Sequence, residues 1–377
     1  MAEKQILIVC GEASGDLNAA NLAKNILKIN PKIKIFAVGG NLLKQAGAEI
    51  IYDIKDLSVM GFFDVLKKLP NFFALKKFVL EKIARIKPDL IILVDFSGFN
   101  LRLAKDINKS IPIIYYISPQ VWASRAGRIN TIKEYISKMI VLFKFEEDFY
   151  KKHGVNVDLT GHPLLDIVKP SMDKNDFISK YYISGAKKTI AILPGSRKAE
   201  IKNILPIMLE AAEILSKKIP DIQFVIAKSP QVDMKDYKSI MSSFNFDIKI
   251  IEGKTYDCLN VADFCFVCSG TATLETAIMQ KPFCIIYKMN LLNYLLYRPQ
   301  VKIPFIGMVN IVADKLIVPE FIQFRARPED IAEKTLEIIN LPSEINRIKD
   351  ELAKVKDSLG ETGASARAAK IVVDYLK

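Results

Sequence analysis

The sequence predicts an α/β protein built from two Rossmann-like domains. Strand-like runs rich in Ile and Val alternate with segments of helical period, and each run is continuously apolar rather than alternating. Parallel strands covered by helices on both faces have this pattern. The pattern restarts after residue 170, and the length of 377 residues suits roughly two domains of about 150 residues or more.

The predicted strands fall into two sets. The first set covers residues 5–10, 33–38, 89–95, 113–117, 138–143 and 155–160, and the second covers 189–193, 223–227, 248–251, 263–267 and 283–287. Pro163 and Pro170 flank a polar stretch between the sets, so the domain boundary is expected within residues 163–173. Three segments are therefore predicted: residues 1–168, residues 169–358, and a terminal helix in residues 359–377 that either bridges the domains or packs ordinarily.

The composition indicates an anionic partner. The chain has 54 basic and 42 acidic residues, a net charge of +12, and a mean hydropathy of +0.17, which is high for a soluble enzyme. Nucleic acid, phosphate-bearing ligands and an anionic membrane surface all suit this charge. No apolar run of about 18 residues and no cleavable leader are evident, so a cytoplasmic chain without a membrane span is expected. The five cysteines are expected to be buried thiols in a reducing compartment.

The first strand leads into a glycine-bearing turn, Gly-Glu-Ala-Ser-Gly-Asp at residues 11–16. Ligands of open parallel sheets bind at the carboxyl ends of strands, where glycine lets the backbone approach them. The spacing differs from the dinucleotide fingerprint, so a nicotinamide cofactor is disfavoured, and no cofactor is predicted. Glu12 and Asp16 are candidates for holding sugar hydroxyls, although a tight turn alone would also explain the glycines.

Asp95 ends the buried strand at residues 90–94 and is the candidate catalytic residue. A carboxylate at this edge of a sheet is partly desolvated, which raises its pKa and makes it a better general base. The alternative is that Asp95 only caps the next helix.

Two helix starts in the second half are candidate anion sites. Pro-Gly-Ser-Arg at residues 194–197 and Ser-Gly-Thr at residues 269–271 each join a strand to a helix. A helix start offers unpaired N–H groups and a positive dipole end, and Arg197 adds a fork that suits phosphate. Glu275, one turn into the second helix, is a candidate for binding ribose hydroxyls. Ordinary helix capping explains either start taken alone.

Residues 60–87 are aromatic and basic, with doubled phenylalanines between lysines. The segment either lies at a membrane interface or against acyl chains, which we favour, or packs on the sheet with a solvated lysine face. Nucleic acid is not a predicted partner because no recognition motif accompanies the charge. No metal is predicted, since the chain has two histidines and no Asp-x-Asp pair.

Several segments taken in order resemble the lipid-A-disaccharide synthase family. They are residues 11–16, Val-Met-Gly at 59–61, Val-Asp at 94–95, Ser-Pro-Gln-Val-Trp-Ala at 118–123, Gly-His-Pro at 161–163, Leu-Pro-Gly-Ser-Arg at 193–197, residues 269–275 and Asn310. The first of these and the 118–123 block are specific to the family, whereas the Ser-Gly-Thr helix is shared among many UDP-sugar transferases. The resemblance spans almost the whole chain.

The resemblance implies a GT-B fold, two Rossmann-like domains whose sheets face an interdomain cleft. It implies transfer of 2,3-diacylglucosamine from UDP-2,3-diacylglucosamine to 2,3-diacylglucosamine 1-phosphate (lipid X), with inversion, at the cytoplasmic face of the inner membrane. Asp95 would be the base, Arg197, Gly270 and Thr271 would hold the departing UDP, and Glu275 would hold the ribose. The other implied substrate contacts are Glu12, Ser14, Asp16, Met60, Asn100, Gln120, Ser269, Gln300 and Asn310.

Other functions remain open at this point. A UDP-sugar 2-epimerase or a transferase acting on a polyprenyl carrier would share the fold, although epimerases have a different constellation of acids and histidines. A two-lobed ligand-binding protein is the non-enzymatic alternative. The sequence also leaves open whether the chain forms a homodimer.

Overall fold

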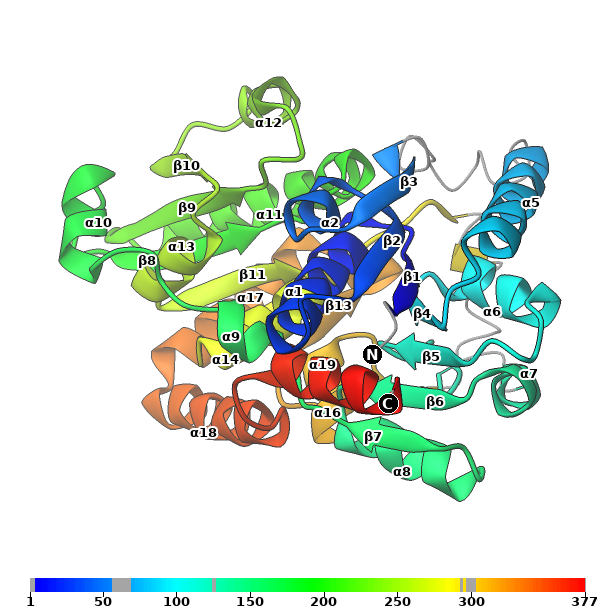
Figure 1. Ribbon diagram of the computed structural model, residues 1–377. Coiled ribbons are helices and arrows are strands. Elements are labelled where there is room, and N and C mark those ends of the chain that lie inside the picture. The colour runs from blue at the N-terminus through cyan, green and yellow to red at the C-terminus, as the bar shows by residue number, and fades with distance from the viewer. Residues whose placement is uncertain (1–3, 56–68, 124–126, 292–293, 296–302, 377) are drawn as a thin grey trace. The chain divides into compact units, whose positions relative to one another are not determined.

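The chain folds into two compact units in the computed structural model, which describes residues 4–55, 69–123, 127–291, 294–295 and 303–376. The first unit comprises Met1–Asp166 together with Leu359–Lys377, and the second comprises Ile167–Ser358. The C-terminal segment therefore belongs to the same unit as the N-terminal half (Figure 1).

The first unit is built on a parallel sheet with the strand order β3-β2-β1-β4-β5-β6-β7 (Figure 1). Its strands are β1 (Gln5–Val9), β2 (Lys34–Gly39), β3 (Glu49–Asp53), β4 (Leu90–Val94), β5 (Ile113–Tyr116), β6 (Lys138–Val141) and β7 (Val157–Leu159). The central strands β1 and β4 are apolar, and all of β4 is buried. Both faces of these strands are apolar because helices cover both faces of the sheet.

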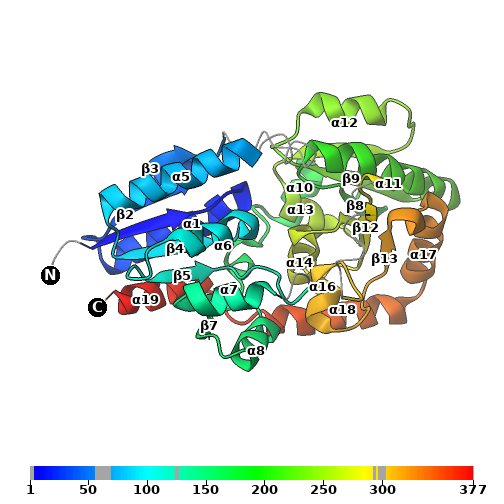
Figure 2. The ribbon, with the colours of Figure 1, turned by 90° about the vertical axis from the view of Figure 1, so that its right-hand side faces the viewer.

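Helices cover each face of this sheet. They are α1 (Ala13–Ile29), α2 (Asn41–Gln45), α5 (Leu69–Ile86), α6 (Ser97–Asp106), α7 (Arg128–Tyr135), α8 (Lys144–Lys152), α9 (Leu164–Ile167), which lies at the unit boundary, and α19 (Ala364–Tyr375). Side chains of α5 to α8 share one core with Leu7 and Val9 of β1. Successive strand residues point to opposite faces, so Ile6 and Ile8 face the other side, where α1 and α19 pack together (Figure 2).

Helix α5 lies in the segment that the sequence marks as basic and aromatic. Leu75, Val79 and Ile83 follow a helical spacing and are buried in the core, so this stripe packs on the sheet. Phe73 on another side of the helix is 58% exposed. Residues 56–68, which include Met60, lie outside the described part of the chain. No described helix is long and apolar enough to cross a membrane.

Helix α19 returns the chain to the first unit. Its buried residues are Ala364, Ser365, Ala368, Ala369, Val372 and Val373, a stripe of small side chains that allows close approach to α1. The Arg367 guanidinium donates to the carbonyl oxygen of Thr160 at 2.7 and 2.9 Å, and the His162 N–H donates to the Leu359 carbonyl at 2.9 Å. A Cβ on Gly161 would lie 2.9 Å from that same carbonyl oxygen, so glycine is needed where the two chain segments cross.

The second unit repeats the architecture with the strand order β10-β9-β8-β11-β12-β13, again all parallel (Figure 1). Its strands are β8 (Lys188–Leu193), β9 (Ile222–Lys228), β10 (Ile248–Glu252), β11 (Phe264–Cys268), β12 (Phe283–Tyr287) and β13 (Glu320–Ile322). Its helices are α10 (Lys174–Lys180), α11 (Lys198–Lys218), α12 (Met234–Met241), α13 (Thr255–Val261), α14 (Thr271–Ile278), α16 (Met308–Ala313), the short 3-10 helix η2 (Gln323–Arg325), α17 (Pro328–Asn340) and α18 (Pro342–Ser358).

The predicted α/β class with two parallel sheets is confirmed, and each predicted strand coincides with an observed one to within two residues at either end. Strands β3 and β13, which are outermost in their sheets, are not among the predicted strands. Both are only half-buried or less, so neither forms a continuous apolar run. The five cysteines are buried thiols, as expected.

Candidate active site

Each sheet has one place where the strand order reverses, between β1 and β4 in the first and between β8 and β11 in the second. Ligands of open parallel sheets bind outside the carboxyl ends of the strands at such places. In the first unit the turns there contain Glu12 and Asp95, and in the second they contain Arg197 and Gly270. The topology therefore brings these predicted residues to the edges where the fold favours ligands.

Asp95 follows β4 in a strained turn. Asp95 and Phe96 have φ angles of 47° and 46°, in the left-handed region that non-glycine residues rarely occupy. The Asp95 carbonyl oxygen accepts hydrogen bonds from Asn100 Nδ2 at 2.9 Å and from the Tyr115 hydroxyl. The Asp95 N–H donates to the Tyr116 carbonyl at 3.2 Å. Strain held by surrounding contacts in this way clusters at functional sites.

Phe96 joins the Asp95 turn to the turn after β1. A Cβ on Gly11 would lie 2.3 Å from Cγ of the Phe96 ring, so the ring occupies the space that any other residue at position 11 would need. Phe96 also stacks on Phe99, with ring centroids 5.2 Å apart. Gly11 is therefore required by close packing of the two turns.

The environment of Asp95 suits a general base. Burial and, to a smaller extent, the negative charge of Glu12 raise the pKa of the Asp95 carboxyl to about 6, against the opposing effect of a hydrogen bond from the Phe96 N–H. A carboxylate with this pKa is ionised at neutral pH and more basic than an ordinary aspartate. Glu12 itself is exposed at the N-cap of α1.

Arg128 is a residue near this turn that the sequence analysis misses. It begins α7, and its Nη1 lies 3.4 Å from the Ser97 hydroxyl, two residues after Asp95. Its charge also acts on Tyr115, the residue that donates to the Asp95 carbonyl, although burial dominates and raises the pKa of that phenol. The sequence feature that could have indicated Arg128 is its position shortly after the segment at residues 118–123.

A buried carboxylate, Glu146, holds the loop that contains Gln120. Its Oε1 accepts from the Ser118 hydroxyl at 2.7 Å and from Trp122 Nε1 at 3.2 Å. Burial raises the pKa of Glu146 against these hydrogen bonds. Gln120 is exposed on the loop. No local sequence pattern indicates Glu146, because its partners lie 24 and 28 residues earlier in the chain.

Asp16 and Asn100 bond backbone groups of the first unit, although the buried Oδ1 of Asn100 has no hydrogen-bond partner among the described residues. The Asp16 carboxylate is buried and accepts backbone hydrogen bonds from Gly40 at 2.7 Å, Leu42 at 3.1 Å and Leu43 at 3.3 Å, at the start of α2. Asn100 is fully buried, and its Nδ2 is directed at main-chain carbonyls at the ends of β1 and β4. Ser14 is exposed in the first turn of α1.

Arg197 precedes α11 in a turn that Glu200 organises. The Glu200 carboxylate accepts the backbone N–H groups of Ser196 at 2.9 Å and Arg197 at 3.2 Å, and it pairs with the Arg197 guanidinium at 3.2 Å. Two of the N–H groups that the sequence analysis assigns to an anion are therefore already bound to Glu200. The Arg197 side chain remains 68% exposed.

The start of α14 is the better anion site of the two. Gly270 is its N-cap with a φ of 145°, and no side chain caps the helix. Gly270 and Thr271 are exposed, and a Cβ on Gly270 would meet nothing within 4 Å. Unpaired N–H groups and the positive end of the helix dipole therefore face open space, which suits a phosphate. Ser269, just before the turn, is half-buried.

Glu275 lies one turn into α14 and has a partner from α13. The Tyr256 hydroxyl donates to Glu275 Oε1 at 3.0 Å. Burial raises the pKa of Glu275, and the hydrogen bond from Tyr256 lowers it. The carboxylate is thus held in one orientation beside the start of α14, which suits a side chain that accepts hydrogen bonds from ribose hydroxyls.

Asn310 does not reach the open edge of the sheet. Its amide is fully buried and bonds to the backbone of Ile317 and Val318 and to the Glu320 carboxylate, at 2.9 to 3.2 Å. These contacts hold the segment between α16 and β13 in place, which is the role of Asn310 that its hydrogen bonds support. Gln300 and Met60 lie outside the described residues.

Comparison with known proteins identifies the family. The family model described as lipid-A-disaccharide synthetase matches residues 6–372. The chain is 41% identical over 381 residues to the lipid-A-disaccharide synthase of Syntrophus aciditrophicus, covering 100% of this chain and 99% of that protein. It is 37% identical to the Myxococcus xanthus enzyme of the same name, with 99% and 97% covered. The chain belongs to the lipid-A-disaccharide synthase family.

Solved structures support the GT-B fold. The glycotransferase of kitacinnamycin superposes with a TM-score of 0.66 at 13% identity, covering all of both chains. A UDP-GlcNAc 2-epimerase from Neisseria meningitidis, bound to UDP-GlcNAc, superposes with a TM-score of 0.60 at 16% identity, covering 99% of each. At these identities the likeness concerns the fold alone. The predicted lipid-A-disaccharide synthase resemblance and the predicted GT-B class are both confirmed.

Proposed function

We propose that the chain transfers 2,3-diacylglucosamine from UDP-2,3-diacylglucosamine to lipid X, forming the β(1→6) lipid A disaccharide 1-phosphate and UDP. Membership of the lipid-A-disaccharide synthase family supports the reaction class. The observation that carries the proposal within the fold is Asp95, a strained, partly desolvated carboxylate with a pKa of about 6 at the reversal point of the first sheet.

In the proposed reaction Asp95 accepts the proton of the acceptor 6-hydroxyl while that oxygen attacks the anomeric carbon of the donor. The bond from the anomeric carbon to the UDP oxygen breaks, and the electron pair leaves with UDP. The charge that develops on the diphosphate needs preorganised donors. The exposed start of α14 at Gly270 and Thr271 supplies backbone N–H groups, and the Arg197 guanidinium supplies positive charge.

The proposed division of labour assigns the acceptor to the first unit and the UDP moiety to the second. Glu275, oriented by Tyr256, suits the ribose hydroxyls. Glu12 and Gln120 are exposed at the turns after β1 and β5 and are retained as acceptor contacts. Asp16, Asn100 and Asn310 are assigned instead to holding the loops, because the Asp16 carboxylate, the Asn100 Nδ2 and the Asn310 amide bond backbone groups of neighbouring segments.

We further propose peripheral association with the cytoplasmic face of the inner membrane. The net charge of +12 suits anionic headgroups, and Phe73 is exposed on α5 within reach of the charge of Lys76, whose Nζ lies 5.9 Å from the ring centroid.

The test is an assay of purified protein with UDP-2,3-diacylglucosamine and lipid X. Equal amounts of UDP and disaccharide 1-phosphate are expected, detected by chromatography and mass spectrometry. Donor and acceptor lacking acyl chains serve as matched controls. Conversion of the donor to its 2-epimer without disaccharide, or no turnover by a protein that binds UDP, would contradict the proposal.

A further inference from the structure

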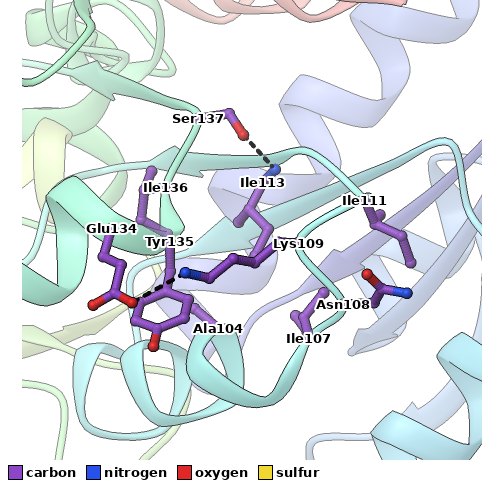
Figure 3. Close-up of a pocket in the computed structure, with 10 residues that line it drawn as sticks. All are labelled: Ala104, Ile107, Asn108, Lys109, Ile111, Ile113, Glu134, Tyr135, Ile136 and Ser137. Carbon is purple, nitrogen blue, oxygen red and sulfur yellow. Dashed lines mark hydrogen bonds and ion pairs between the residues drawn. The ribbon is translucent and has the colours of Figure 1, made fainter.

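Each unit also has a cavity at the opposite, amino-terminal edge of its sheet. The cavity in the first unit, of about 260 Å³, lies where α6 leads into β5 and α7 leads into β6 (Figure 3). Its lysine, Lys109, pairs with Glu134 at 3.0 Å, and its Nζ lies 4.9 Å from the Tyr135 ring centroid. The positive charge in this cavity is therefore neutralised by its own lining.

The cavity in the second unit is larger, about 510 Å³, and its lining differs. It lies at the amino ends of β8, β9, β11 and β12, beneath residues of α17 and α18. Its apolar lining includes Ile190, Ile222, Phe264, Ile339 and Ile345. Four lysines and one acid also line it, namely Lys174, Lys188, Lys281, Lys349 and Asp263, which gives a formal charge of +3.

Within the part of the chain that the structure describes, three lysines of this cavity lack an ion pair of the kind that neutralises Lys109 in the first unit. The ion pairs of the described residues include none that involves Lys174, Lys281 or Lys349. Lys281 Nζ donates to the carbonyls of Asn260 at 2.8 Å and Ala262 at 3.1 Å, which leaves its charge unopposed by a carboxylate contact.

Two further features describe the charges in this cavity. Burial lowers the pKa of Lys281, and the charges of Lys174 and Lys349 lower it further, against the opposing effects of Cys265 and Asp263. The Asp263 carboxylate accepts the Thr189 N–H at 2.8 Å, so the single acid is committed to the backbone. Like charges gathered on a partly apolar cavity are relieved when an anion binds between them.

We propose that this cavity binds a phosphate-bearing anion with an apolar portion. The ammonium groups of Lys174, Lys281 and Lys349 would contact the phosphate, and the isoleucines would contact the apolar part. The site is distinct from the candidate UDP site, because it lies at the amino ends of the strands whose carboxyl ends carry Arg197 and Gly270. The same chemistry is offered by a soluble phosphate ester and by the headgroup of an anionic lipid.

The experiment compares Lys174→Gln/Lys349→Gln with Lys218→Gln/Lys238→Gln. All four lysines are exposed and both pairs remove two charges, but only the first pair lines the cavity. Inorganic phosphate is titrated calorimetrically into each full-length protein in the presence and absence of saturating UDP. We expect the cavity variant to bind phosphate at least about tenfold more weakly than the wild type in UDP-saturated protein, and the control variant to bind normally.

Sedimentation with phosphatidylglycerol and phosphatidylcholine vesicles distinguishes the sources. Weaker binding of the cavity variant to phosphatidylglycerol vesicles supports a lipid headgroup, and an effect confined to inorganic phosphate supports a soluble ester. Equal phosphate binding by the cavity and control variants, or no phosphate binding by UDP-saturated wild type, would overturn the proposal. Circular dichroism of both variants checks that the fold is retained.

Discussion

The turns at the two strand-order reversals differ in the residues that adopt positive φ angles and in their exposure to solvent. In the first unit, Asp95 and Phe96 adopt left-handed φ angles without glycine, held by hydrogen bonds from Asn100 and Tyr115 to the Asp95 carbonyl. In the second unit, the positive φ angles fall on Gly195 and Gly270, and the Gly270 turn is exposed. An acid that must keep a raised pKa needs a rigid, desolvated setting, whereas a phosphate needs backbone N–H groups that it can reach.

The largest expected effect is on the rigid turn. Asp95→Asn should lower kcat by about 10²–10⁴-fold, because the amide cannot accept the acceptor proton. UDP binding, measured by calorimetry, should stay within about twofold, since we propose that UDP binds to the second unit. Activity close to that of the wild type would remove Asp95 as the base.

Gly270→Ala tests the open turn. A φ of 145° is strained for alanine by about 1–3 kcal/mol, so the start of α14 should shift and UDP affinity should fall about tenfold. Gly185→Ala is the matched control, because Gly185 lies in the same unit, has no positive φ and has open space around it. An equal loss of UDP binding in both variants would mean that the α14 turn has no special role.

The pH dependence sharpens the contrast in solvation. Only ionised Asp95 can act as the base, so kcat/KM should fall about tenfold between pH 7 and pH 5, with an apparent pKa near 6. The folded-state pKa lies above the ordinary value of 3.8, so the group's contribution to stability is full below that value and is lost as the pH rises through about 6. Urea unfolding should therefore show a loss of stability of the wild type between about pH 4.5 and about pH 7.5 that is smaller in Asp95→Asn.

The smallest expected effect concerns orientation in the open unit. Tyr256→Phe removes one hydrogen bond to Glu275, worth about 0.5–1.5 kcal/mol, so the Kd for UDP should rise about two- to tenfold. A UDP analogue that lacks the 2′- and 3′-hydroxyls of the ribose should bind wild type and variant equally if the tyrosine acts through Glu275. Tyr182→Phe, at a tyrosine that is 85% exposed, is the control.

The sequence predicts those features that depend on local composition. The buried central strands are continuous apolar runs, and Asp95 is marked by ending one of them. The edge strands β3 and β13 are missed because half-buried strands carry polar residues. The sequence does not tell whether a polar side chain faces a ligand or a buried backbone group, and Asp16, Asn100 and Asn310 show that a predicted substrate contact can bond the backbone of a neighbouring segment. Glu146 and Arg128 depend on contacts between distant segments, which no local pattern reveals.

The return of the chain through α19 has a consequence for biosynthesis. The small-residue stripe of α19 covers α1, and Arg367 secures the end of β7, so the N-terminal half lacks part of its own packing until residues 359–377 have emerged from the ribosome. The intervening 192 residues of Ile167–Ser358 can complete their sheet first, as an inserted domain does. A nascent chain stalled before Leu359 would therefore expose the apolar side of α1 and depend on chaperones, even though most of its helices and strands had already been made.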